Sequence, residues 1–212
     1  MLGARASGSM GHAPLDIALE VAEETCLPVM CQLDWPPQSP VEIISRLGKG
    51  DVPTHCFRYF PAAPARSDGR IREEILEVRE RGVIIDINHG VGSFGFETAE
   101  TMLNAGFLPD AISSDVHLLS IKSPAYGQLV TLSKFLNLGM SITDIIATST
   151  KGPARAIRRP NLGTLSLGSI CDATILSIEN GKFIFTDSFG HTRSGENKFT
   201  LKGIVLDGEI WS

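Results

Sequence analysis

The chain opens with a helical pattern of apolar positions followed by a continuous apolar run. From Pro14 to Thr25 the apolar residues recur at helical spacing, which predicts a helix. The run LPVMCQL at 27–33 is apolar almost throughout, as is typical of a parallel strand buried on both faces. These two segments predict a first unit made of a helix and a buried strand.

The same alternation recurs along the next part of the chain. The patterns predict helices over 41–47, 71–81 and 94–105, with apolar strands over 52–55, 83–87 and 111–114. Alternating helices and strands at a spacing of roughly 30 residues are typical of βα units around a parallel sheet. We therefore expect an α/β fold with about four such units.

The last third of the chain has a different pattern of apolar residues and glycines. The stretch SITDIIATSTKGPARAI, starting at Ser141, predicts two helical turns broken by Gly152 and Pro153. Beyond it, alternating runs bounded by glycine, among them GKFIFTD, KFTLKGIVL and GEIW, predict an antiparallel β appendage. We place the boundary near Asn161, which divides the chain into residues 1–160 and 161–212.

Composition narrows the classes of protein to consider. The 212 residues are 42% hydrophobic and 20% charged, which fits a globular chain, and the net charge is -5. The only basic cluster, KGPARAIRRP, is better explained as favourable cations closing a helix, so no nucleic acid partner is expected. No apolar run is long enough to span a membrane, and the start lacks the apolar core of a secretory signal.

Cysteine usage points to a reducing compartment, and we expect a cytoplasmic protein. The cysteines form no CxxC pair and have no regular spacing, which disfavours a zinc knuckle or a disulfide framework. The cysteines are Cys26, Cys31, Cys56 and Cys171. We expect most of them to be small core residues.

Three of the predicted strands end in side chains that can carry chemistry. His55, His89 and Asp115 each follow an apolar run at the point where the chain leaves the strand. In an α/β barrel those carboxyl ends share one face, which is the catalytic one. Taken singly, Asp115 beside Ser113 and Ser114 fits simple turn chemistry, and each histidine fits a hydrogen-bonded core residue. The shared position favours a site.

The glycine-rich stretch HGVGSFGF offers a second candidate element. Gly90 and Gly92 permit a tight turn immediately before a predicted helix, whose N-terminus can hold an anion. Ser93 and the neighbouring amides are candidates to bind a substrate carboxylate. The alternative, that Ser93 only caps the helix, carries equal weight.

Several motifs in order resemble the amidohydrolase superfamily, and within it the dihydroorotase-like group of deacetylases. They are THCF, DINHGVGSFGFETAE, ISSDVH and the late GPARAI…GTLSLGSICDATIL. The resemblance covers the chain from Ala4 onward. It implies a metal-dependent TIM barrel with a β-sandwich built from both chain ends, of which this chain would hold the C-terminal part of the barrel and part of the sandwich.

The resemblance also implies roles for the strand-end residues. His55 would bind a divalent metal, with zinc favoured, and Asp115 would both bind it and carry a proton from a metal-activated water. The substrate would be contacted by His89, Gly90, Gly92, Ser93 and His117. The reaction would be hydrolysis of an amide or ester of a small molecule.

The chain departs from the family pattern at several positions. No His-x-His motif and no earlier barrel strands are matched, so we expect an N-terminally truncated relative. Gly3 stands where the family has a carboxylated lysine, and Gln32 stands where it has a histidine ligand. His55 and Asp115 are then one ligand short of the three protein ligands usual for catalytic zinc.

These departures leave rival functions open. A non-catalytic binding or regulatory relative would bind ligands without turnover, and a dihydroorotase-type or deaminase-type enzyme would use the same acid. Because half a barrel exposes a sheet edge and interior apolar residues, we also expect self-association or a partner that supplies the missing N-terminal half.

Overall fold

The computed structural model describes residues 10–33, 39–59 and 63–211. Gly3 lies outside this described part of the chain. The helices are α2 (Ala13–Thr25), α3 (Pro40–Ser45), α4 (Glu73–Glu80), α5 (Phe96–Asn104), α6 (Gln128–Asn137), α7 (Ile142–Ser149) and α8 (Lys151–Ala156). The strands are β1 (Met30–Gln32), β2 (Val52–Thr54), β3 (Ala173–Thr186), β4 (Thr192–Leu206) and β5 (Glu209–Trp211).

Four extended segments lie side by side in chain order. β1 and β2 pair in parallel, with Gln32 opposite Thr54. Backbone hydrogen bonds then join residues 84–86 to 51–53, and residues 87–90 to 111–114. The second junction includes a parallel bridge between Asp86 and Ala111. The expected parallel arrangement is confirmed for these segments, so their carboxyl ends meet at one edge.

Local signals at the helix ends explain several boundaries. Ser39 caps α3 in a reciprocal capping box with Glu42, and Ser141 caps α7 through the Asp144 amide. The predicted break at Gly152 and Pro153 is wrong. Both residues lie in the first turn of α8, where proline's missing N–H is not needed, and the chain breaks at Thr150 instead.

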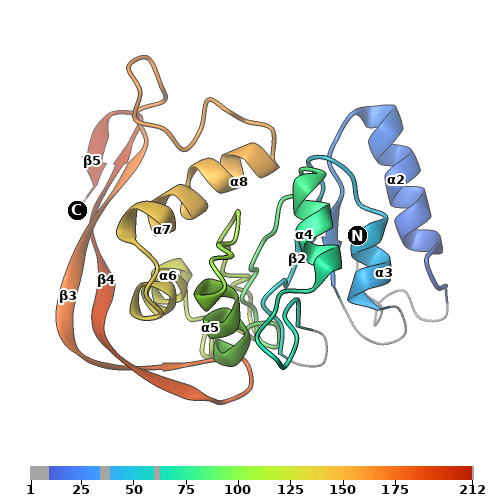
Figure 1. Cartoon of the computed structure of the whole chain (residues 1–212). Coiled ribbons are helices and arrows are strands. Elements are labelled where there is room, and N and C mark those ends of the chain that lie inside the picture. The colour runs from blue at the N-terminus through green and yellow to red at the C-terminus, as the bar shows by residue number, and fades with distance from the viewer. Residues whose placement is uncertain (1–9, 34–38, 60–62, 212) are drawn as a thin grey trace.

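The C-terminal part is the expected antiparallel sheet, in the order β3-β4-β5. β3 and β4 form one long curved hairpin, interrupted by two register shifts. Figure 1 shows this hairpin along one side of the molecule, with α6 packed against β4 and α2 to α4 on the opposite side.

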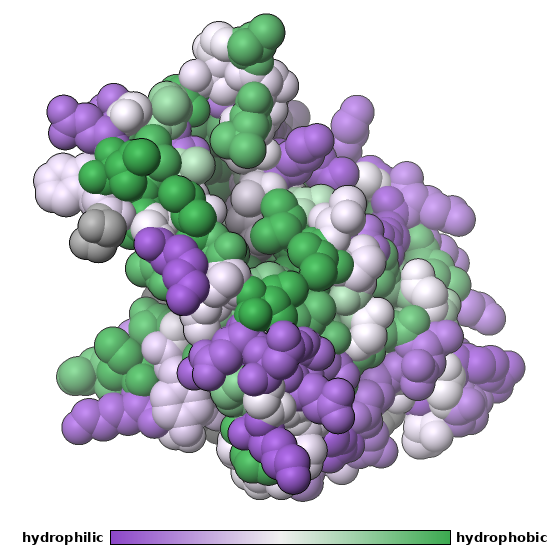
Figure 2. Space-filling view, turned by 90° about the vertical axis from the view of Figure 1, so that its left-hand side faces the viewer, coloured by the Kyte–Doolittle hydropathy of each residue, from purple (hydrophilic) through white to green (hydrophobic). Residues whose placement is uncertain are grey.

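Hydrophobic side chains remain exposed on the sheet side of the molecule. Figure 2 views that side and shows hydrophobic atoms gathered over a broad area of it. The sheet itself contributes exposed Ile175, Leu201, Ile204, Leu206, Ile210 and Trp211. Exposed apolar area on this scale is typical of an interaction surface.

The core joins the parallel segments to the sheet through aromatic rings. Phe94 contacts the rings of both Phe96 and Phe135, and Phe135 also contacts Phe57. Phe185 and Phe199 bring β3 and β4 into the same buried cluster. Within the described residues, no helix is long and apolar enough to cross a membrane.

Candidate active site

His55 stands directly after β2 in a left-handed backbone conformation, with φ 65°. It is buried, and its Nδ1 lies 2.6 Å from the carbonyl oxygen of Asn88 on the neighbouring segment. A carbonyl can only accept, so Nδ1 donates its proton here. In the neutral form of the ring, the lone pair would then be on Nε2. A histidine that donates its second nitrogen to a backbone carbonyl has the orientation usual for metal-binding histidines.

Asp115 ends the fourth extended segment, also in a left-handed conformation, with φ 47°. Its half-buried carboxylate rests against the backbone of Gly90. A Cβ atom built on Gly90 would stand only 2.5 Å from Asp115 Oδ2. The glycine predicted for a tight turn therefore also makes room for the predicted catalytic acid.

Asp86 is a buried acid that the sequence patterns did not single out. It lies on the segment between β2 and residues 111–114, and Ser113 Oγ is 2.8 and 2.9 Å from its two carboxylate oxygens. Burial, with a smaller contribution from the charge of Asp115, raises the pKa of Asp86 to about 7, against the hydrogen bonds from Ser113 and backbone amides that lower it. The sequence signal that could have identified Asp86 is an acid inside the apolar run VIIDI, because a buried carboxyl needs a specific environment.

His89 lies in the interior, next to the glycine-rich stretch. The side chain is fully buried, with Nδ1 2.9 Å from the Gly90 carbonyl and Nε2 2.7 Å from Lys134 Nζ. Burial and the charge of Lys134 lower the pKa of His89 to about 3, so the ring is neutral. His89 thus lies behind Gly90 at this edge, and its contact with a substrate stays a prediction.

Ser93 does not cap the following helix. The N-cap of α5 is Gly95, and the Ser93 hydroxyl instead accepts a hydrogen bond from Arg58 Nη2 at 3.2 Å. The helix N-terminus, which was expected to offer an anion site, is occupied by a carboxylate of the chain itself. Phe96 N donates to Asp187 Oδ2 at 3.2 Å.

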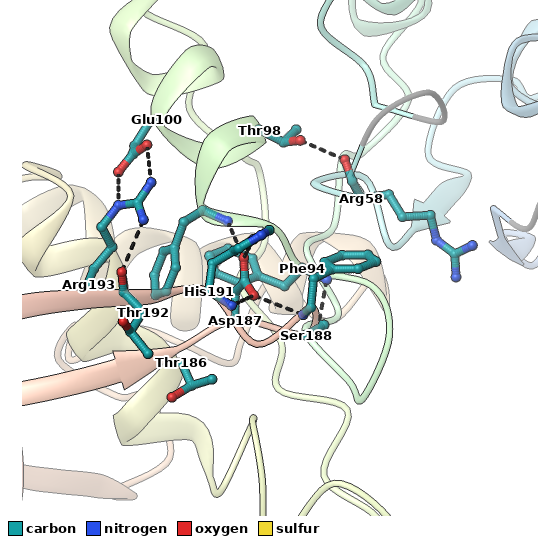
Figure 3. Close-up of polar contacts among 12 residues, drawn as sticks. Arg58, Phe94, Thr98, Glu100, Thr186, Asp187, Ser188, His191, Thr192 and Arg193 are labelled. Carbon is teal, nitrogen blue, oxygen red and sulfur yellow. Dashed lines mark hydrogen bonds and ion pairs between the residues drawn. The ribbon is translucent and has the colours of Figure 1, made fainter.

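Figure 3 shows how the tip of the β3–β4 hairpin makes this contact. Asp187 accepts from three backbone amides and lies 3.2 Å from the His191 ring nitrogen Nδ1, while Arg193 pairs with Glu100 of α5. Ser188 also exchanges hydrogen bonds with Phe94. The hairpin tip thus holds the glycine-rich stretch and the start of α5 in place.

The remaining predicted contacts lie at the surface of the same edge. Gly92 and His117 are exposed, and His117 Nδ1 accepts from the Leu119 amide at 3.2 Å. Gln32 ends β1 and is half-buried. The structure places these residues near carboxyl ends of the parallel segments. Substrate contact by Gly92 and His117 stays a prediction, as does the position of Gln32 in place of a metal-binding histidine.

The donor set fits a divalent metal only in part. An imidazole nitrogen and a carboxylate suit zinc, which takes three protein ligands in catalytic sites. Among the described residues, no group of three or more His, Cys, Asp or Glu side chains is placed to hold a metal ion. His55 and Asp115 follow extended segments that lie two apart in the sheet. As two donors they do not complete a three-ligand site by themselves.

One apolar cavity lies between the helices and the strands, apart from these polar side chains. It measures about 210 Å³ and is lined by apolar side chains of α3 to α5 and by Leu33, Cys56 and Ile85. Because it lies between the helices and the strands, we assign the candidate site to the polar edge instead.

Comparisons with known proteins extend these observations. No protein-family model matches the chain. A deacetylase of Brucella anthropi is 31% identical over 96% of this chain, which corresponds to 50% of that protein. A deacetylase of Enterococcus faecalis is likewise 31% identical, with 56% of its length covered. The chain therefore spans about half the length of the curated relatives it matches.

Two solved structures have the same fold over nearly the whole chain. A crystal structure described as an adenine deaminase has a TM-score of 0.92 at 31% identity, and 97% of this chain covers 56% of that one. A crystal structure described as a dihydroorotase has a TM-score of 0.84 at 30% identity, with 96% and 56% covered. Together, these comparisons show that nearly the whole chain is similar to deacetylases and to structures described as an adenine deaminase and a dihydroorotase.

Proposed function

We propose that the chain carries the catalytic acid of a hydrolase that cleaves an amide or ester of a small molecule in the manner of a deacetylase. The observation that carries this proposal is the Asp115 carboxylate, held against Gly90 at the same sheet edge as His55. The similarity to deacetylases over 96% of the chain supports the same reaction class.

The chemistry assigned to Asp115 is proton transfer. As a water oxygen attacks the carbonyl carbon of the substrate, an Asp115 oxygen accepts the proton that the water loses. The same carboxyl then delivers that proton to the leaving nitrogen or oxygen as its bond to carbon breaks. Half-burial suits this role, because the carboxylate meets the substrate while Gly90 fixes it from behind.

Zinc is the proposed cofactor, and His55 and Asp115 are the side chains that would hold it. When bound, zinc supplies a Lewis acid that makes water more acidic near neutral pH. The described residues provide only part of a zinc site.

We further propose that a second polypeptide segment, equivalent to the part of the relatives that this chain does not match, covers its exposed apolar surfaces. A groove of about 490 Å³ lies between α6, α7 and the sheet, with Leu165 and Ile170 on its wall. Leu165 is 83% exposed, which is unusual for a leucine in a completed core. Filling such a groove with apolar side chains is favourable.

Hydrolysis of N-acetyl amino acids and acetyl esters, with and without added zinc, tests the function. Asp115→Asn should reduce any measured rate by about 10²- to 10⁴-fold, the usual contribution of a positioned acid or base. Asp207→Asn, at an exposed turn, is the matched control. Tight substrate binding without turnover would favour a non-catalytic relative, and ammonia release from adenine would favour the deaminase class named in one structural description.

A further inference from the structure

Lys134 of α6 is completely buried, yet every donor of its ammonium group has a partner. Nζ lies 2.7 Å from His89 Nε2, 2.8 Å from the Pro124 carbonyl and 2.7 Å from the Thr186 carbonyl. An ammonium has three N–H groups, and these are three acceptors from three separate parts of the chain. A buried lysine is costly unless it is bonded in this way.

The lysine fixes the protonation of His89. Because Nζ donates to Nε2, the ring proton is on Nδ1, which donates to the Gly90 carbonyl at 2.9 Å. The ring also stacks on Phe94, with centroids 4.5 Å apart. Both the tautomer and the orientation of the imidazole are therefore determined.

Gly90 transmits this arrangement to the catalytic acid. Its amide donates to the Ser114 carbonyl at 3.1 Å, and its Cα faces Asp115 Oδ2 without room for a side chain. A shift of the Gly90 carbonyl would move the surface on which the Asp115 carboxylate rests.

We propose that Lys134 is a positioning residue for Asp115, acting through the His89 ring and the backbone of Gly90. The lysine also binds Thr186 at the end of β3, so it couples the hairpin to the site edge. The catalytic role of Asp115 rests on the proposed function. The link from Lys134 to Asp115 through His89 and Gly90 is a property of the fold. Burial lowers the pKa of Lys134 to about 7 and the nearby Asp187 charge opposes this shift, so the group is ionised in mildly acidic solution.

Nitrogen NMR of the His89 ring below pH 7 tests, in the unmodified protein, whether Lys134 fixes the tautomer of the ring. We expect a neutral ring protonated at Nδ1 alone, with Nε2 as a hydrogen-bond acceptor. A ring protonated at Nε2 overturns the proposal without any variant being made.

Lys134→Met tests whether Lys134 also holds the backbone of Gly90, on which Asp115 rests. Methionine keeps an unbranched apolar stem and removes the hydrogen-bond donors. Amide hydrogen exchange at Gly90 should become about tenfold faster or more, while exchange at Val52, bonded to Val29 in the β1–β2 pair, should not change. Lys202→Met, at an exposed position of β4, is the matched control and should leave both amides unchanged.

The outcomes separate positioning from general stability. Uniform acceleration at all slow amides would mean that Lys134 only stabilises the fold, and unchanged exchange at Gly90 would equally overturn the proposal. If Lys134→Met does not fold, Lys134→Arg, which keeps the charge but changes donor geometry, should still shift the His89 ring signals. Where hydrolysis is measurable, Lys134→Met should lower kcat with little change in KM, and should add no further loss to Asp115→Asn. Failure of the hydrolysis assay leaves the NMR and exchange results decisive.

Discussion

Gly90 meets two separate constraints at one position. Its φ of 55° is strained for any side chain, and an added Cβ would contact Asp115 Oδ2. Gly106 meets only the first constraint, since its φ is 75° and nothing lies within 4 Å of a built Cβ. The two glycines therefore separate backbone strain from close contact with the acid.

Gly90→Ala should destabilise the protein more than Gly106→Ala does. We expect about 1 kcal/mol for the backbone term at both positions and roughly 1–3 kcal/mol more at Gly90 from the displaced carboxylate. Urea unfolding of both variants measures the difference. Equal losses would show that Asp115 does not depend on the absence of a side chain at this position.

Asp86 should make stability depend on pH in the direction opposite to most aspartates. Burial raises its pKa to about 7, so between about pH 4 and pH 7 the folded state holds a proton that the unfolded chain has released. Its contribution is complete below pH 4 and is lost as the pH rises through 7. Asp86→Asn removes the titration, so the variant should gain stability relative to the wild type as the pH rises.

Unfolding free energies of both proteins at several pH values between 4.5 and 8 test this expectation. The exposed Asp207→Asn serves as the control and should run parallel to the wild type. Parallel curves for Asp86→Asn would mean that the buried carboxyl is already ionised in the folded state at pH 4.5.

At the scale of the elements, the hairpin tip depends on one buried acid. Asp187 has a fully buried side chain and accepts hydrogen bonds from the amides of Phe96, Phe189 and His191. Asp187→Ala leaves these donors without their acceptor, which should cost about 3 kcal/mol. Glu196→Ala on the exposed side of β4 is the control, and urea unfolding is the measurement. A loss below 1 kcal/mol would show that water replaces the carboxylate at the hairpin tip.

Sequence patterns predicted the elements that alternate clearly and missed the one that does not. α2 was expected from Pro14 to Thr25 because its apolar positions follow helical spacing. The helix begins one residue earlier, at Ala13. α6 was not predicted. Five consecutive residues, 131–135, are buried in it, including Thr131, Ser133 and Lys134, so no polar face reveals a helix.

The site was predictable to the same limited extent. His55 and Asp115 follow apolar runs, so their position at one edge could be inferred from parallel topology alone. The partners of His89 could not, because Lys134 is 45 residues away on the unpredicted helix. The same holds for Asp187, which reaches the start of α5 from the far end of β3. Contacts of this kind are set by tertiary packing, which local patterns do not encode.

At the scale of the whole molecule, the incomplete ligand set limits metal binding. With His55 and Asp115 as the two strong donors, and with no group of three His, Cys, Asp or Glu side chains among the described residues, we expect weak binding of at most one zinc ion. Elemental analysis after mild chelation should find less than one ion per chain. Two tightly held ions would contradict this and would require ligands other than those named.

The exposed apolar surface sets how the chain behaves alone. Sheet residues such as Ile204 and Leu206, with Leu165 and Leu167 of the preceding loop, leave large side chains in water, and Ile17 and Val21 do the same on α2. At about 25 cal/mol per Å², a few hundred Å² of such surface corresponds to several kcal/mol, comparable with the stability of a domain. Burial of this surface should therefore drive association.

Light scattering of the chain produced alone should show dimers or larger species. Co-production with the part of the Brucella anthropi deacetylase that this chain does not match should replace them with a defined two-component complex. Replacing Leu165 and Leu167 with serine should reduce the self-association, whereas Leu76→Ser on α4, also exposed but remote from the sheet, should not. A cooperatively melting monomer at high concentration would show that these side chains need no covering, and it would remove the reason to expect a partner.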